Sequence, residues 1–208
     1  DAPKLYEKVR SVVSYPLGAY QFVVYEDAGI KSLEDLKGKR IFIGPRGGQA
    51  FTSATTLLEA VTGYKPNEDY DVAFYDWSTA IQAFQDRQID AYVGPNALPY
   101  SQLSQIALSD KIRLLGVPQA ALDNPEVKRM FSQPGKSLET VPADVYGANQ
   151  TNESDVYALG AYVGLGSHTG VDEEAVYNLT KTMFENLPEL HKTAPWMKAI
   201  NPDNAFRQ

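Results

Sequence analysis

The residues best placed to do chemistry are three glycines, Gly44, Gly47 and Gly48, which follow the apolar run 41–43. Glycine lets the backbone turn sharply and approach a ligand closely. If a helix begins at Gln49, its first N–H groups and the positive end of its dipole point at one place. This pattern predicts a site for an anion, either a carboxylate or a phosphate. An ordinary strand-to-helix turn with nothing bound is the alternative that the spacing leaves open.

A strand and a helix must hold these glycines in place. The apolar run 41–43 is typical of a parallel strand that is covered on both faces. Apolar residues then recur at helical spacing from 51 to 61, and Gly63 supplies a stop. Strands and helices alternate over 40–116, which predicts an α/β unit with a mostly parallel sheet. Ligands bind at the carboxyl ends of such strands, where the glycine turn and the loop 94–96 both lie.

The sequence outside this turn predicts further elements, each from its local pattern of apolar residues and capping residues. We expect strands at 12–15, 20–25, 71–75, 88–94, 111–115 and 156–163, a helix 79–86 capped by Ser78, helices at 100–108 and from Asp172 to 186, and a turn-rich segment at 132–142.

Composition narrows the class of protein. The 208 residues carry a formal net charge of -7 and no cysteine. The negative charge argues against general binding to nucleic acid or to an anionic membrane surface. The absence of cysteine excludes disulfides, thiolate chemistry and zinc–cysteine sites. No stretch is long and apolar enough to span a bilayer.

Catalytic patterns are missing from the sequence. The two histidines are His168, in an expected loop, and His191, in a polar helix near the end. Neither stands in a nucleophile motif or a metal-binding motif, so a solvated surface role is favoured for both. We therefore expect a chain that is not an enzyme and that uses no cofactor and no metal.

Aromatic residues cluster near the expected strand ends. Trp77 follows one strand, Tyr92 precedes the loop that begins at Gly94, and Tyr146 lies beside a glycine. Tyrosine and tryptophan combine a large apolar surface with one hydrogen-bonding atom, which suits a cleft around a small polar ligand. Packing of helices onto the sheet is the alternative for each of them.

Several segments, in this order, resemble those of one family. Residues 29–41, with the sequence GIKSLEDLKGKRI, resemble the entry to the second lobe of type II periplasmic binding proteins. The TAXI branch of the TRAP-transporter solute receptors is resembled by residues 57–60, 83–91, 112–115, 141–146 and 176–186. The first segment is shared by many binding proteins, whereas the ordered set is more specific.

The resemblance implies a periplasmic receptor with two lobes, each a mostly parallel sheet flanked by helices. Such a receptor closes around a glutamate-like or other small carboxylate and delivers it to membrane permease subunits of the TRAP type. The expected divisions are a hinge and lobe-one segment at 1–27, lobe two at 28–143, and a return to lobe one at 144–208. Lobe one is expected to be incomplete, with self-association as one consequence.

The expected ligand-binding residues are those of the glycine turn, where an anion is expected to bind, together with aromatic and polar residues from other segments. The family turn usually reads Gly-Ser-Gly-Thr, and this chain has glycine, glycine, glutamine and alanine at 47–50, which lack both hydroxyls. We expect contacts from Arg46, Gly47, Gly48, Gln49, Ala50, Phe51, Thr52, Trp77, Asn96 and Tyr146.

One alternative function has the same fold. A ligand-sensing effector domain of a regulator would also bind a small acid at this turn. An enzyme on the same fold is disfavoured, because the sequence pairs no nucleophile with a base.

Overall fold

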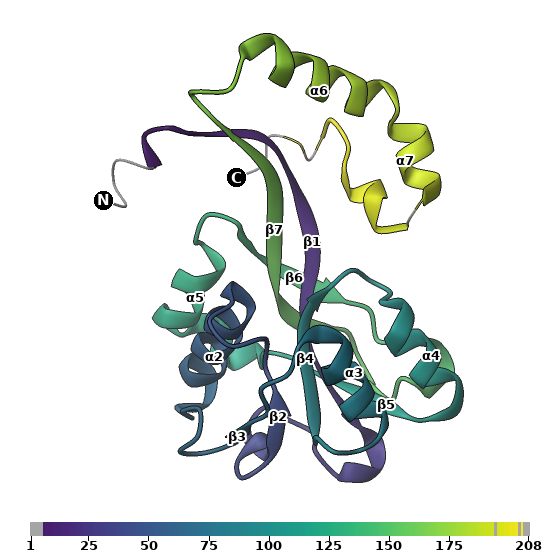
Figure 1. Ribbon diagram of the computed structural model, residues 1–208. Helices are drawn as coiled ribbons and strands as arrows, with labels where there is room; N and C mark the ends of the chain where they lie inside the picture. Colours follow the sequence, from purple (N-terminus) through teal and green to yellow (C-terminus); the bar gives the residue numbers. More distant parts are fainter. Residues whose placement is uncertain (1–5, 194, 204, 206–208) are drawn as a thin grey trace. The chain divides into compact units, whose positions relative to one another are not determined.

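A computed structural model describes residues 6–193, 195–203 and 205, and they divide into two compact units (Figure 1). The larger unit is the continuous segment Gly18–Gly160, and the smaller combines the two ends of the chain, up to Leu17 and from Ala161. Both boundaries fall within long strands. The expected divisions at 27/28 and 143/144 lie at other positions, and the assignment of lobes stays a prediction.

The larger unit is an α/β layer structure, as the sequence predicts. Strand β2 (Arg40–Phe42) runs parallel to β3 (Asp71–Val72) on one side and to β4 (Ala91–Asn96) on the other. Strand β1 (Val9–Tyr25) then pairs antiparallel with β4 and with β5 (Ile112–Leu115). The sheet is thus mixed, parallel only where strands alternate with helices along the chain.

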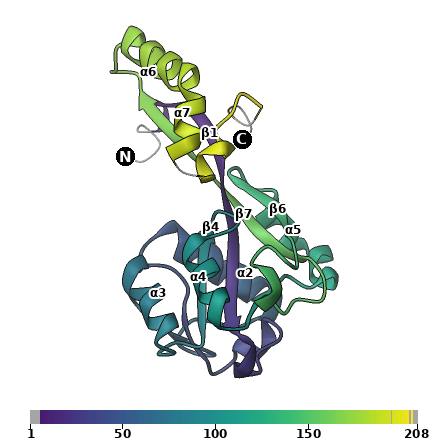
Figure 2. The same cartoon turned by 90° about the vertical axis from the view of Figure 1, so that its right-hand side faces the viewer.

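Helices cover both faces of this sheet. Figure 2 shows α3 and α4 on one side and α2 and α5 on the other. The bounds are Gln49–Thr62 for α2, Trp77–Gln85 for α3, Ser101–Ser109 for α4 and Pro125–Phe131 for α5.

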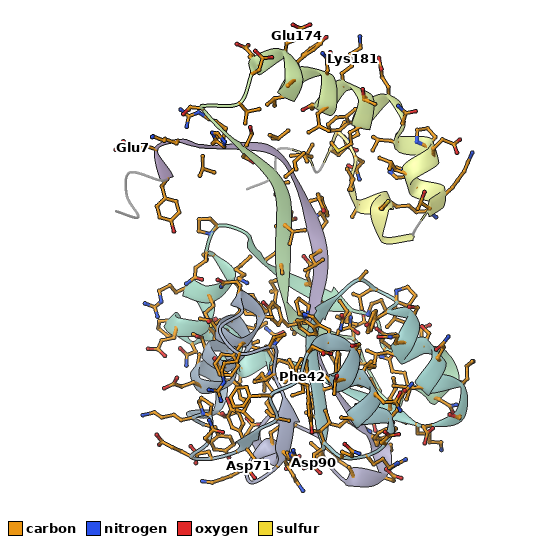
Figure 3. All side chains as sticks on the ribbon, in the orientation of Figure 1. Glu7, Phe42, Asp71, Asp90, Glu174 and Lys181 are labelled. Atoms are coloured by element: carbon orange, nitrogen blue, oxygen red, sulfur yellow. The ribbon has the colours of Figure 1, made fainter. Side chains whose placement is uncertain are left out.

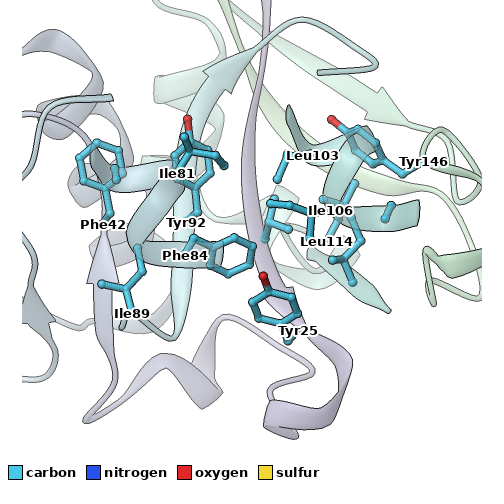
Figure 4. Close-up of a cluster of buried hydrophobic side chains, with 14 of the residues drawn as sticks. Tyr25, Phe42, Ile81, Phe84, Ile89, Tyr92, Leu103, Ile106, Leu114 and Tyr146 are labelled. Carbon is cyan, nitrogen blue, oxygen red and sulfur yellow. The ribbon is translucent and has the colours of Figure 1, made fainter. Parts of the chain in front are cut away.

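An aromatic core fills the space between the sheet and the helices α3 and α4 (Figure 4). Phe42 stacks on Tyr92, with ring centroids 5.6 Å apart, because these residues are neighbours in the β2–β4 register. Tyr25 stacks on Phe84 of α3 at 4.5 Å. Burial of such large rings contributes about 1.5–3 kcal/mol each, so the core fixes the strands that carry the glycine turn.

The two edges of the parallel strands differ. Asp71 and Asp90 lie at the amino ends of β3 and β4, and Figure 3 shows them at the outer rim, with Phe42 inside the unit. Asp90 accepts a hydrogen bond from the Arg40 backbone N–H at 2.8 Å, which fixes the start of β2. The glycine turn is at the opposite, carboxyl edge.

Several local predictions need correction. The expected strands 12–15 and 20–25 are one strand of 17 residues, β1. The N-cap of α3 is Asp76, which accepts from the Thr79 N–H at 2.8 Å, and Ser78 is inside the helix. The segment expected to be turn-rich contains strand β6 (Lys136–Val141), because pairing with another strand decides its conformation and local propensity does not.

The smaller unit contains α6 (Glu173–Glu185), α7 (Leu187–Thr193) and the outer parts of β1 and β7. Strand β7 (Val156–His168) extends beyond the expected strand, so His168 ends a strand and does not lie in a loop. Asp172 caps α6 as predicted, accepting from the Ala175 N–H at 3.0 Å. No residue of α6 is fully buried, and its partly buried residues, Val176, Thr180, Met183 and Phe184, lie on one face of the helix.

An ion pair ties the end of β1 to the rest of the larger unit. Arg113 on β5 donates to both carboxylate oxygens of Glu26, from Nε at 2.8 Å and from Nη2 at 3.0 Å. Thr151 donates its hydroxyl to the same carboxylate at 2.6 Å. These hydrogen bonds, with Arg113 contributing most, lower the pKa of Glu26 to about 2.

The substitution Glu26→Gln is therefore expected to lower the free energy of unfolding by about 1–2 kcal/mol, after allowance for partial exposure of the pair. Because the pKa of Glu26 is lower in the folded state, its contribution is complete above about pH 4.5 and is lost as the pH falls toward about 2. Urea unfolding at several pH values should show a flatter profile for the variant in this window. Glu189→Gln, at an exposed pair with Lys192, is the control and should leave the profile unchanged.

Candidate functional site

The glycine turn brings the backbone of β2 against the start of α2. Gly44 has a φ of 106°, and a Cβ atom on it would lie 2.6 Å from the backbone nitrogen of Phe51. Gly47, with a φ of 74°, completes the reversal of the chain. Only a residue without a side chain fits at Gly44, so glycine there sets the position of the helix start.

The N-terminus of α2 has donors that the protein does not use. Gly48 is the N-cap residue, and no side chain caps the helix. Among the described residues, none accepts a hydrogen bond from the backbone N–H of Gln49, Ala50 or Phe51. These donors and the helix dipole favour an anion, as the sequence predicts.

A lysine from a distant strand lies beside this turn of helix. Lys136 Nζ donates to Ser53 Oγ at 2.8 Å and stands 5.1 Å from the centroid of the buried Tyr20 ring. Ser53 Oγ also accepts from Gln49 Nε2 at 3.1 Å, which links the lysine to the first turn of α2. Lys136 is thus held among neutral groups.

The charge of Lys136 has no counter-ion in the described part of the chain. No Asp or Glu oxygen forms an ion pair with its ammonium group there. Burial lowers the pKa of Lys136 because the charged form loses solvation. An anion bound at α2 would supply the missing counter-charge, which makes this arrangement more specific than a helix end alone.

A second polar group lies at the end of β4. Tyr92, Gly94 and Asn96 are every second residue along β4, so they lie on the same face of the strand. A Cβ on Gly94 would lie 2.9 Å from Trp77, 3.0 Å from the Asn96 amide nitrogen and 3.1 Å from the Tyr92 hydroxyl. These three side chains therefore meet over Gly94, and Trp77 leaves 38% of its surface exposed.

A hydrogen-bonded network of Tyr146, Gln21 and Tyr100 holds the Asn96 end of this group in place. The Tyr146 hydroxyl donates to Gln21 Oε1 and accepts from the Tyr100 backbone N–H at 3.1 Å. Gln21 Nε2 donates to the Asn96 carbonyl at 3.0 Å. Burial, as the largest cause, raises the pKa of Tyr146 to about 12, so its hydroxyl stays protonated and able to donate. The network holds the loop after β4 in one conformation.

The sheet brings the two polar groups to one edge. Phe42 and Tyr92 are register partners in parallel strands, so the chain runs on from each of them, toward Gly44 and toward Gly94, to the same edge of the sheet. Tyr20 and Gln21 on β1 lie opposite Pro95 and Gly94. The lysine group lies on the α2 face and the tyrosine group on the α3 face of the same carboxyl edge.

The ten expected ligand-binding residues fall into three places. Arg46 through Thr52 form the turn and the first helical turn, where the Arg46 guanidinium lies 4.1 Å from the Phe74 ring centroid. Trp77 and Asn96 meet over Gly94. Tyr146 is buried in the supporting network and is 7% exposed. Their contacts with a ligand remain predictions.

Three residues of the site were absent from the sequence prediction: Lys136, Ser53 and Tyr20. Tyr92 was noted there as an aromatic residue near a strand end, but not among the ten expected ligand-binding residues. Lys136 gave no signal, because it lies 83 positions from Ser53 and within the segment 132–142, whose sequence predicts turns. Ser53 could have been found, since it lies four residues after Gln49 on the same helix face.

Other kinds of site were sought in the described part of the chain. It contains no group of three or more His, Cys, Asp or Glu side chains arranged to hold a metal ion. Among its helices, none combines the length and the apolar character needed to cross a bilayer.

Comparison with protein families gives one match over nearly the whole chain. A family model described as the NMT1-like family matches residues 2–208. This range includes the glycine turn, Lys136 and both compact units.

Solved structures with a similar arrangement include three binding proteins. The periplasmic aliphatic sulphonate binding protein SsuA from Escherichia coli is 23% identical over 59% of this chain and 43% of its own, with a TM-score of 0.42. A TRAP periplasmic solute binding protein from Desulfovibrio salexigens with bound orotic acid is 12% identical over 93% and 46%, with a TM-score of 0.44. A substrate binding protein of an ABC uptake transporter from Streptococcus pneumoniae with bound histidine is 16% identical over 98% and 65%, with a TM-score of 0.46.

The chain spans 43% to 65% of the lengths of these three proteins. Their names describe binding proteins. At these TM-scores they support no statement about individual residues.

The glycine turn itself can be tested. Gly44→Ala should lower the free energy of unfolding by more than about 1–2 kcal/mol, because both the positive φ and the Phe51 backbone oppose a Cβ. The control is Gly38→Ala, where φ is 72° and no atom lies within 4 Å of the added Cβ. Urea unfolding measures both, and equal losses would show that the close approach at Gly44 is unimportant.

Proposed function

The chain belongs to the NMT1-like family, and on that premise we propose that it is a solute-binding protein of a membrane transporter, with a small organic acid as its ligand. The ligand's anionic group binds at the start of α2. The same acid makes further contacts at the end of β4, where Trp77 and Asn96 meet.

One observation carries this proposal: Lys136 is a half-buried cation that is hydrogen-bonded to Ser53 of α2, a helix whose N-terminus has no side-chain cap. Burying a charge without a counter-ion costs free energy, which a functional site recovers when ligand binds. The N–H groups of Gln49, Ala50 and Phe51 and the Lys136 ammonium all favour a negative ligand.

A binding role also agrees with what surrounds the turn. The nearby tyrosines are hydrogen-bonded to glutamines and backbone, and no nucleophile–base pair occurs among the described residues of the edge. Binding with release, and no chemical conversion, is the function that this set of groups supports.

The finer assignment rests on the sequence resemblance. We propose that the chain serves a TRAP-type transporter as a TAXI receptor, in the periplasm, and delivers a glutamate-like or other carboxylate to permease subunits. The solved structures named above include both TRAP and ABC binding proteins, so they do not choose between these transporter classes. The two-lobed arrangement is part of the same proposal.

Isothermal titration calorimetry and thermal shift with a panel of acids test the binding. The panel contains L-glutamate, 2-oxoglutarate, glutarate and pentanoate, with cyclohexylamine as a cationic control. We expect at least one acid to raise the melting temperature, and at equal concentrations the acid that binds more tightly should give the larger shift. No response to any acid would contradict the proposal.

Lys136→Met is expected to weaken the binding of the best acid by about 10-fold or more, because a hydrogen bond to a charged group is lost. The unliganded variant should be as stable as the wild type or more stable, since an unpaired buried charge is removed. Lys128→Met is the control, because Lys128 is exposed and pairs with Asp123. Equal affinities for the two variants would exclude Lys136 from the site.

The pH dependence provides an independent check. Because burial lowers the pKa of Lys136 below 10.5, the wild type should lose acid affinity at alkaline pH earlier than an ordinary lysine would allow. Calorimetry between pH 7 and pH 10 would measure the decline, which should be absent in the residual binding of Lys136→Met.

A further inference from the structure

The hydroxyl of Tyr92 is an unused polar group inside the larger unit. The side chain is fully buried, and its Oη forms no hydrogen bond with any described residue. The Asn96 amide and the Tyr100 hydroxyl lie close enough to influence its pKa, yet neither makes a hydrogen bond of normal geometry with it. A buried donor without a partner costs about 1–3 kcal/mol, so its retention needs a reason.

The geometry shows where this hydroxyl points. It stands 3.1 Å from the place of a Cβ on Gly94, two residues toward the carboxyl end of β4. Figure 4 shows it directed away from Phe84 and Ile89, which lie at the other end of the ring. The hydroxyl therefore approaches the same edge of the sheet at which α2 begins.

The tyrosines around it are satisfied without it. Tyr146 uses its hydroxyl both to donate to Gln21 and to accept from Tyr100. The Tyr100 hydroxyl donates to Gln102. The protons of both neighbouring tyrosine hydroxyls are thus used elsewhere, and neither is donated to Tyr92.

The three atoms nearest to the space above Gly94 belong to the side chains of Trp77, Asn96 and Tyr92. Asn96 Nδ2 makes one bond there, to the Gly94 carbonyl at 3.3 Å, and Trp77 is 38% exposed. Both side chains can rotate without moving the strand. A ligand at the edge could therefore reach the hydroxyl when they turn.

From this geometry we infer that Tyr92 Oη donates a hydrogen bond to a second polar group of the bound acid. The inference rests on the proposed function and specifies its ligand class. The ligand is a short organic acid with a hydrogen-bond acceptor in addition to the anionic group held at α2. Because the two positions lie on opposite faces of the sheet at the same carboxyl edge, the two polar groups of the ligand must be joined by a chain that passes around the ends of β2 and β4.

Glutarate and pentanoate are the probes, since they share a five-carbon chain and differ in the second carboxylate. The wild type should bind glutarate about 10-fold or more tightly than pentanoate. Tyr92→Phe should weaken glutarate about 5- to 30-fold, leave pentanoate nearly unchanged, and so reduce the ratio toward one. The variant should be no less stable than the wild type, because the hydroxyl has no protein partner.

Tyr70 supplies a matched control. It is also buried with an unpartnered hydroxyl, but it lies just before β3, at the amino edge of the sheet. Tyr70→Phe should leave both affinities unchanged. Tyr146→Phe is a second control for stability alone and should be less stable than Tyr92→Phe, because it loses two hydrogen bonds.

The outcomes separate the two proposals. If the wild type binds neither these acids nor others of the panel, the proposed function fails and this inference fails with it. If the wild type binds glutarate and Tyr92→Phe keeps the wild-type ratio, only this inference fails. A loss of stability in Tyr92→Phe would show that a buried water or the protein already satisfies the hydroxyl, which also overturns it.

Discussion

The backbone N–H groups at the start of α2 need an acceptor, and the described chain offers none. Gly44 makes this possible, because its lack of a side chain lets β2 run directly against the Phe51 amide. A side-chain cap at Gly48 would have satisfied one donor and blocked the position. The arrangement of the rest of the edge follows from this open helix end.

Lys136 adds a positive charge without a counter-ion to the carboxyl edge of the sheet. Its ammonium is held by Ser53 and lies near the Tyr20 ring, both neutral, so the field of the cation is not cancelled locally. By contrast, the cation of Arg113 is neutralised by the Glu26 carboxylate. The fold thus uses one buried cation for stability and leaves another available. This difference is the physical basis for placing ligand binding at the carboxyl edge.

The site has an electrostatic half and a hydrogen-bonding half, on opposite faces of one sheet. Parallel pairing of β2 and β4 aligns their ends, and the antiparallel β1 brings Tyr20 and Gln21 to the same level from the opposite chain direction. The mixed sheet is therefore part of the site. If β1 ran parallel to β4, its chain direction would be reversed, and Tyr20 and Gln21 would not both lie beside Gly94 and Pro95 in the present register.

Local patterns were enough for much of this description. The apolar run 41–43, the glycines after it and the stop at Gly63 determine a strand, a turn and a helix, because backbone freedom and periodicity are local properties. The anion preference of the turn follows from the same residues. The segment 132–142 shows the limit, since its strand β6 depends on pairing with a partner that local sequence does not reveal.

Only the tertiary structure decided which distant groups meet at the turn. Lys136 reaches Ser53 across 83 positions, and Tyr92 lacks a partner because the hydroxyls around it are used elsewhere. Burial and unsatisfied hydrogen bonding are properties of the packed chain, so no spacing in the sequence encodes them directly. The sequence by itself predicted an anion site at the glycine turn, and the packing of the sheet decided which cation and which unpartnered hydroxyl lie near it.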